Sequence, residues 1–337
     1  MVPTGDGHGA RQRALIRGAS PTAESTAAAL TAASGPIRRG LSTPWMIVLA
    51  SFLFASMGVC VKLASTIYSP GEIVIYRGLT GAAMMIGLAR WKLGTLRTTV
   101  PGMHLWRSLS GATALCLWFY AISQLPLATA MTLNYMSSVW MALFLLGGAV
   151  ALGSARVDGR LIGTVLLGFI GVALILRPTI AEQQLWHGLL GLLSGILAAT
   201  AYLQVTALGR VGEPEYRVVF YFSLGGICAG SLTMLWSGGL HAHTWKGAAL
   251  LLAVGVLATA AQLLLTRAYS TGRPLVNASL QYLGIVFSFI YGVLLFNDAV
   301  TWMALLGMLL IVAAGLSATL LRSRSAPPDT ANAPLES

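Results

Sequence analysis

Long apolar segments separated by short polar connections dominate this chain. Each is close to the roughly 20 residues that a helix needs to cross a hydrocarbon core about 30 Å thick. We place ten of them at 44–66, 70–89, 104–123, 126–151, 159–177, 186–208, 215–237, 247–269, 274–296 and 299–321. Runs of this length exceed what a barrel strand requires. The pattern therefore predicts an all-α membrane protein with ten transmembrane helices.

The chain also repeats itself at a fixed offset. The stretch AISQLPLATAMTLNY at 121–135 is echoed by AYSTGRPLVNASLQY at 268–282, and LIGTVLLGFIG at 161–171 by LLGMLLIVAAG at 305–315. Because each repeat has an odd number of spans, the second copy must enter the membrane upside down. The sequence predicts two inverted five-helix repeats around a central cavity.

The predicted domain bounds follow from this repeat. Repeat 1 covers 44–178 and repeat 2 covers 186–322. Residues 1–43 and 323–337 are polar, show no periodic apolar face and are predicted to be disordered cytoplasmic tails. The GxxxG spacings at Gly159–Gly163, Gly191–Gly195 and Gly226–Gly230 favour close helix packing, within one chain or in a homodimer.

Composition agrees with a membrane location. The chain is 56% hydrophobic and 9% charged, whereas soluble domains carry about 25% charged residues. The net charge of +11 does not indicate nucleic-acid binding, because the basic residues are scattered in short connections. Cys60, Cys116 and Cys228 lie singly in apolar stretches, which favours packing over disulfide or metal-binding roles.

The distribution of Lys and Arg predicts the orientation. If the N-terminus is cytoplasmic, the outer connections hold only Arg177 and Lys246, and the other basic residues near span ends, Arg107 among them, fall on the inner side. This is the positive-inside bias. We expect both termini to be cytoplasmic and the protein to lie in a bacterial-type inner membrane.

Two side-chain amides are the first candidates for a binding site. Asn134 lies eight residues after Pro126, roughly 12 Å into the membrane, and Gln281 occupies the equivalent place in repeat 2. Amides offer donors and acceptors to a polar substrate, although they also join helices in membrane bundles. Four neighbours complete this candidate set: Ser138, Asn277, Tyr135 and Tyr282.

Lys62 and Arg77 are the basic residues that we place inside spans. They are candidates for an ion pair, for binding a substrate carboxylate, or for orientation by snorkelling. Glu72 could pair with either cation. Trp118 is a candidate for stacking on a substrate, with packing as the alternative.

The motifs FASMGVCVKLAS, SPGEIVIYRGLTG and FYAISQLPLATAMTLNY resemble the drug/metabolite transporter superfamily with two EamA-type repeats. The resemblance covers roughly residues 44–322. It implies a cavity lined by spans 1–4 and 6–9, peripheral spans 5 and 10, and alternating access without ATP. The YRG and LPLATAMTLNY stretches are more loosely similar to a branch that includes S-adenosylmethionine carriers.

These observations predict a secondary transporter for a small polar organic metabolite, such as an amino acid, S-adenosylmethionine or a related compound. A channel or a membrane protein without transport function is the alternative. An intramembrane enzyme is disfavoured, because the spans show no nucleophile–base set or group of metal ligands. The expected partners are a small-molecule substrate and the lipid bilayer, with no cofactor and no nucleic acid.

Overall fold

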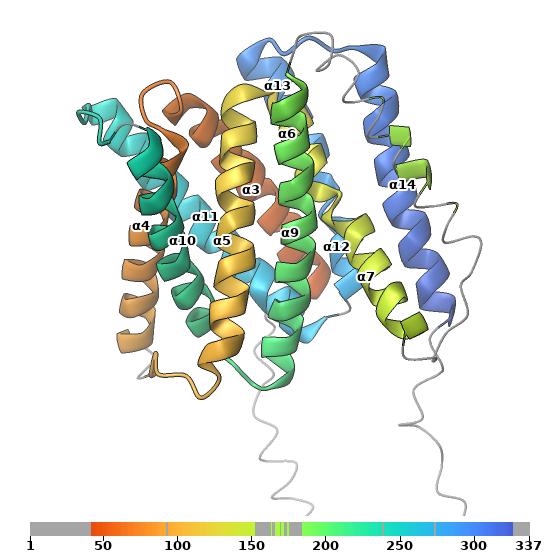
Figure 1. The fold of residues 1–337 in the computed structure, drawn as a ribbon, viewed down its shortest axis with the longest axis horizontal. Coiled ribbons are helices and arrows are strands. Elements are labelled where there is room, and N and C mark those ends of the chain that lie inside the picture. Colours follow the sequence, from red (N-terminus) through yellow and green to blue (C-terminus); the bar gives the residue numbers. More distant parts are fainter. Residues whose placement is uncertain are drawn as a thin grey trace, which may run out of the picture. The chain divides into compact units, whose positions relative to one another are not determined.

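The computed structural model describes residues 42–91, 94–151, 184–237, 239–272 and 274–325, together with single positions between 163 and 174. This part of the chain contains helices and no strand. The helices all belong to one compact unit, Thr43–Ser337. They are α3 (Thr43–Ala64), α4 (Pro70–Trp91), α5 (Pro101–Gln124), α6 (Leu127–Tyr135), α7 (Ser137–Ala151), α9 (Leu185–Arg210), α10 (Glu215–Ser237), α11 (Trp245–Thr271), α12 (Pro274–Leu280), α13 (Leu283–Phe296) and α14 (Trp302–Ser325) (Figure 1).

The helices follow the predicted segments closely, with ends that differ by a few residues. Helices α3, α4, α9, α10 and α11 are long and apolar enough to cross a membrane. The predicted segment 159–177 falls mostly outside the described residues, as do the two predicted tails. The end of α14 extends the last helix to Ser325, beyond the predicted limit at 321.

Two predicted spans are each broken into two helices, which corrects the continuous segments 126–151 and 274–296. Helix α6 ends at Tyr135 and α7 begins at Ser137, while α12 ends at Leu280 and α13 begins at Leu283. At the second break the N–H of Gly284 donates to the carbonyl of Gln281, three residues back instead of four. Under the 147-residue offset the two breaks fall within two residues of each other.

Glycines allow the closest helix contacts. A Cβ added to Gly71 would stand 2.9 Å from the carbonyl oxygen of Gly230, and one added to Gly230 would stand 2.8 Å from that of Gly71. Helices α4 and α10 therefore meet backbone to backbone. Gly195 meets the carbonyl of Leu133 in the same way, which packs α9 on α6. For these glycines the GxxxG spacing serves packing within one chain.

The helix neighbours follow the repeat. Helix α3 packs on α11, and its counterpart α9 packs on α5, the counterpart of α11. Helix α4 packs on its own counterpart, α10. Figure 1 shows α5 and α9 running side by side, with α7 and α14 to one side of them. Among the other helices of the described part of the chain, α14 contacts α12, α7 and α6.

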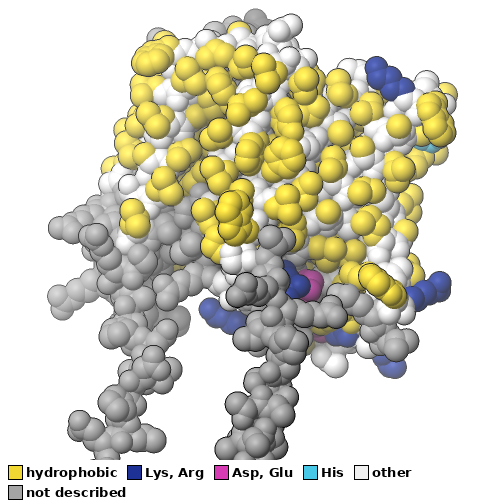
Figure 2. Space-filling model, turned by 180° about the vertical axis from the view of Figure 1, so that it is seen from behind, with side chains coloured by type: hydrophobic (Ala, Val, Ile, Leu, Met, Phe, Trp, Pro, Cys, Tyr) yellow, Lys and Arg dark blue, Asp and Glu magenta, His cyan; other side chains and the backbone are white. Residues whose placement is uncertain are grey.

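The surface is apolar between its two ends. Figure 2 shows hydrophobic side chains across the middle of one face, with Lys and Arg near the ends. Highly exposed tryptophans lie at or near helix ends: Trp45, Trp91, Trp106, Trp186, Trp245 and Trp302. Tryptophan at these positions matches the aromatic belt of membrane proteins.

Candidate functional site

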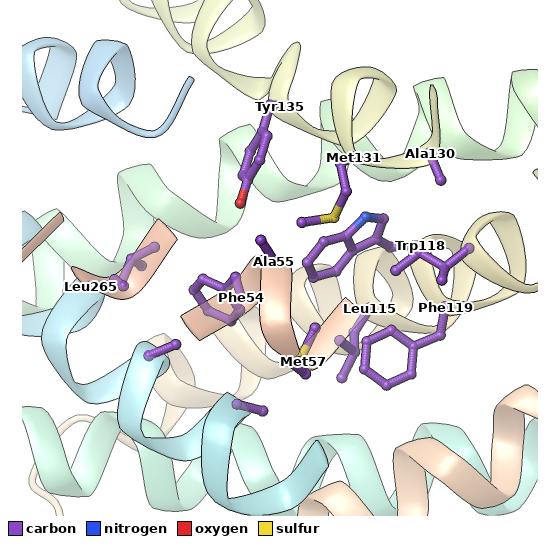
Figure 3. Close-up of a cluster of buried hydrophobic side chains, with 14 of the residues drawn as sticks. Phe54, Ala55, Met57, Leu115, Trp118, Phe119, Ala130, Met131, Tyr135 and Leu265 are labelled. Carbon is purple, nitrogen blue, oxygen red and sulfur yellow. The ribbon is translucent and has the colours of Figure 1, made fainter. Parts of the chain in front are cut away.

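A small cavity of about 50 Å³ lies inside the helical unit. Its walls come from seven helices: α3, α4, α5, α6, α9, α10 and α11. Aromatic side chains form much of the wall, and Figure 3 shows Phe54, Trp118 and Tyr135 gathered from α3, α5 and α6. The polar side chains at the wall are Arg77, Arg107, Asn134, Tyr135, Tyr202 and Gln262.

Two arginines give this cavity its charge. Arg77 on α4 and Arg107 on α5 are 4% and 2% exposed. Both guanidinium carbons lie over the ring of Phe222, at 5.0 Å for Arg77 and 4.2 Å for Arg107. The Nε atom of each arginine and Nη1 of Arg107 are buried without a hydrogen-bond partner. The site therefore holds two buried cations that share one aromatic ring.

The acidic side chains of the described residues are engaged elsewhere. Glu213 pairs with Arg217 at 2.9 Å, Glu215 lies 3.9 Å from Arg267, and Asp298 lies 3.6 Å from Lys62. Glu72 accepts hydrogen bonds from the backbone N–H groups of Ser69 and His241, at 3.0 and 2.8 Å. The described acids therefore leave both cavity arginines without an ion pair.

The pairing suggested for Glu72 with Lys62 or Arg77 was wrong. Glu72 and Ser69 form a reciprocal capping box at the start of α4, in which the Glu72 N–H donates to the Ser69 hydroxyl at 3.3 Å. The His241 ring also lies 2.6 Å from the Glu72 carboxylate. Glu72 thus fixes the helix start and the loop before α11, and it does not neutralise a cation in the cavity.

Helix starts set the positions of the two arginines. Each follows a Pro-Gly pair that begins its helix, Arg77 seven residues after Pro70 and Arg107 six residues after Pro101, so each is almost two turns inside its helix. Gly111 provides room one turn further along α5, because a Cβ there would overlap Nη1 of Arg107. A side chain at position 111 would push the guanidinium from its place.

The predicted amides mainly join helices. Asn134 lines the cavity, yet its amide donates to the Ser194 hydroxyl on α9 at 3.0 Å. Gln281 donates to the hydroxyl of Tyr269 at 2.8 Å and does not line this cavity. The ring of Tyr269 stacks on Tyr202 at 5.1 Å. The Tyr269 ring thus separates Gln281 from Tyr202 at the cavity wall.

Of the remaining predicted residues, some line the cavity and others join helices. Tyr135 and Trp118 line the cavity. Ser138 donates to the carbonyl of Ala278 at 3.0 Å, and Asn277 to that of Ala268 at 2.6 Å. Both bonds join separate helices. Tyr282 is buried, but neither it nor Ser138 nor Asn277 is part of the cavity wall.

Lys62 lies away from the cavity, at the end of α3. Its Nζ atom donates to the carbonyl of Leu125 at 3.0 Å and lies 3.6 Å from Asp298. The Asp298 carboxylate accepts the N–H of Leu127 at 3.1 Å. Lys62 therefore ties α3 to the start of α6 and to the loop after α13.

Sequence reasoning missed Arg107 and Gln262. We counted Arg107 among the basic residues that set orientation, although it lies six residues after Pro101 and Arg77 lies seven after Pro70. That similar depth was the available signal. Gln262 was detectable as the single amide within the apolar run of α11. Phe222 gave no signal, because one Phe in an apolar span is ordinary packing.

A family comparison identifies the class of protein. The model of the EamA-like transporter family matches residues 41–177 and again residues 185–319. The chain belongs to this family. It is therefore an integral membrane protein and a membrane transporter of the drug/metabolite type, as the motifs in its first four spans indicated.

Individual relatives agree with this assignment. The chain is 33% identical to the pseudopaline exporter CntI of Pseudomonas aeruginosa strain UCBPP-PA14, over 80% of this chain and 93% of that protein. It is 27% identical to a riboflavin transporter of Rhizobium johnstonii, over 83% and 91%. One crystal structure covers 85% of this chain and 99% of its own with a TM-score of 0.62. At 18% identity that likeness supports the fold alone.

Proposed function

We propose that the protein is a secondary transporter that moves a small polar organic metabolite by alternating access. One observation carries this proposal: the cavity wall is built from both segments that match the family model. Arg77, Arg107 and Asn134 come from the first segment, and Tyr202 and Gln262 from the second. A site at the interface of two repeats is exposed to either side when the halves rock.

The helix contacts support two inverted halves of five spans each. Exchanging each helix for its counterpart turns the α3–α11 contact into the α9–α5 contact and leaves α4–α10 unchanged. A two-fold relation between the halves has this consequence. The breaks after Tyr135 and Leu280, which fall within two residues of each other under the 147-residue offset, add a second likeness between the halves. Discontinuous helices are typical of transporter sites.

The cavity as it stands is smaller than a typical metabolite site. Pockets for small molecules measure about 300–1,000 Å³, whereas this cavity has about 50 Å³. A metabolite can enter only if the helices around the cavity separate. The relatives are named for organic metabolites, pseudopaline and riboflavin. We extend only the general class to this chain, and an amino acid, S-adenosylmethionine or a related compound fits it.

Uptake into proteoliposomes tests this proposal. The full-length protein would be reconstituted and offered labelled amino acids, S-adenosylmethionine, riboflavin and nucleosides. We expect saturable uptake of at least one compound and its acceleration by the same compound inside. A channel would give uptake without saturation or counterflow. Absence of flux for every compound, with the protein folded in the membrane, would count against a transporter of this class.

The same uptake assay tests which of the two predicted amides, Asn134 or Gln281, contributes more to transport. Asn134→Ala removes a group at the cavity wall, so we expect at least a tenfold fall in uptake. Gln281→Ala breaks the bond to Tyr269 behind the wall, and we expect a smaller loss. Equal loss in both variants would contradict this ranking. Thr200→Ala, which removes a hydroxyl bonded only within α9, is the control.

A further inference from the structure

We propose that Arg77 and Arg107 together bind the anionic group of the transported metabolite, a carboxylate or a phosphate. This inference rests on the proposed transport function and names the substrate class for the same cavity. A neutral polar metabolite would not need these cations. The two guanidinium groups are the charged groups at the cavity wall.

Burial of two uncompensated cations is costly. Removing a charged group from water costs several kcal/mol unless a counter-charge or hydrogen bonds repay it. Both guanidinium groups contact the same aromatic ring, that of Phe222. A cation–π contact contributes only about 0.5–2 kcal/mol. The two arginines therefore carry an electrostatic cost that an entering anion would relieve.

The chemistry of the unpaired atoms fits an oxyanion. Guanidinium N–H groups form a planar fork that matches a carboxylate or phosphate, often through two parallel hydrogen bonds. Nε and Nη1 of Arg107 and Nε of Arg77 have no partner in the described structure. Two forks beside one ring can hold one anionic group from two sides, or two groups of one dianion.

Residues of the chain do not supply the missing charge within the described structure. Glu72, Glu213, Glu215 and Asp298 each have a cationic or hydrogen-bonding partner away from the cavity. The rest of the chain's Asp and Glu residues lie outside the described residues and outside the segments predicted to span the membrane.

The rest of the wall suits an organic anion better than an inorganic one. Trp118, Phe54 and Tyr202 offer aromatic faces to a carbon skeleton. Asn134 and Gln262 offer amide groups for a further polar substituent. We therefore place the anionic group of the metabolite at the arginines, and its apolar part against the aromatic rings.

Matched pairs of anion and neutral analogue provide the test. Thermal unfolding of the purified full-length protein would be followed with succinate and succinamide, glutamate and glutamine, benzoate and benzamide, and glycerol 3-phosphate and glycerol. We expect at least one anion to raise Tm in a saturable way while its neutral partner does not. A Tm shift with a carboxylate indicates a carboxylate site, and a shift with glycerol 3-phosphate indicates a phosphate site.

Variants then assign the effect to the two side chains. Arg77→Gln and Arg107→Gln should each weaken binding of that anion at least tenfold, and Arg77→Lys should recover part of it because the charge returns without the fork. Without anion, the Gln variants should unfold at the wild-type Tm or above it, because each removes an uncompensated buried charge. Arg90→Gln, at an exposed position of the same helix α4, should bind like the wild type.

Several results would overturn this assignment. They are an equal Tm shift by the neutral partner, an anion shift that persists in both Gln variants, and no shift by any anion of the panel. Saturable proteoliposome uptake of a neutral compound, unchanged in Arg77→Gln, would reject the anion site and leave the transporter intact. If the wild-type protein takes up no compound of the proteoliposome panel, that result would instead count against the transport function itself.

Discussion

Gly111 controls the position of Arg107, and this can be tested with one methyl group. A Cβ at Gly111 would overlap Nη1 of Arg107 and approach Cε2 of Phe222 to 3.1 Å. The guanidinium end of Arg107 is flexible and will move. We predict that Gly111→Ala lowers uptake or anion binding at least tenfold while Tm stays within a few degrees, since Ala favours a helix by about 1 kcal/mol over Gly.

Gly87→Ala is the matched control for that substitution. Nothing lies within 4 Å of a Cβ at Gly87 on α4, so the change should leave transport untouched. Wild-type transport by Gly111→Ala would show that the observed position of Arg107 is not required. A large fall in Tm would show instead that the methyl group disturbs helix packing.

For single residues, the sequence predicted which side chains are buried in the membrane part better than it predicted what each of them contacts. Arg77, Asn134, Tyr135 and Trp118 were selected from their positions in apolar spans, and all line the cavity. Gln281 was selected by repeat equivalence, yet it bonds to Tyr269 behind the wall. Depth along a helix can be counted from a proline, but the direction of a side chain depends on which neighbouring helix packs against it.

Among the elements, the Lys62–Asp298 pair connects three segments at one end of the unit. Lys62 binds the carbonyl before α6, and Asp298 accepts the N–H of Leu127 at the start of α6. Both side chains are largely buried, at 20% and 17% exposure. We predict that Asp298→Asn destabilises the protein by about 1–2 kcal/mol, because it removes a charged acceptor from two donors.

A double-mutant cycle measures this contribution. Lys62→Met, Asp298→Asn and the double variant would be compared by thermal unfolding in one detergent, and we expect a coupling of about 1 kcal/mol. The Arg267–Glu215 pair is the control, since its atoms are 3.9 Å apart and Arg267 is 54% exposed. That pair should contribute almost nothing. Equal coupling in both pairs would contradict a structural role specific to Lys62.

Hydropathy predicted the elements well but not the two breaks. Apart from the amides Asn134 and Gln281, the residues around Tyr135 and Tyr282 are apolar or small, and neither break contains Pro or a charge. The chain bends there without leaving the apolar environment, so a sliding average cannot detect it. The second break is visible in the backbone, where the N–H of Gly284 donates to the carbonyl of Gln281, three residues back instead of the four of a regular α-helix. Only the repeat comparison had drawn attention to these positions.

For the whole molecule, orientation is the prediction that links the fold to the direction of transport. The connection before α5 carries Arg97, while the one before α11 is followed by Lys246. The positive-inside bias places the first in the cytoplasm and the second outside. Thr99 and Ala242 are exposed in these two connections, so each can carry a reporter cysteine.

Labelling from one side decides this orientation. Cys60, Cys116 and Cys228 would first be replaced by Ala, since all three are free thiols. We predict that a membrane-impermeant maleimide labels Ala242→Cys in intact cells and Thr99→Cys only after permeabilisation. The opposite pattern would reverse the topology. Labelling of both positions in intact cells would contradict an assignment of these connections to opposite sides. It would also contradict the proposal of two inverted halves with an odd number of spans each.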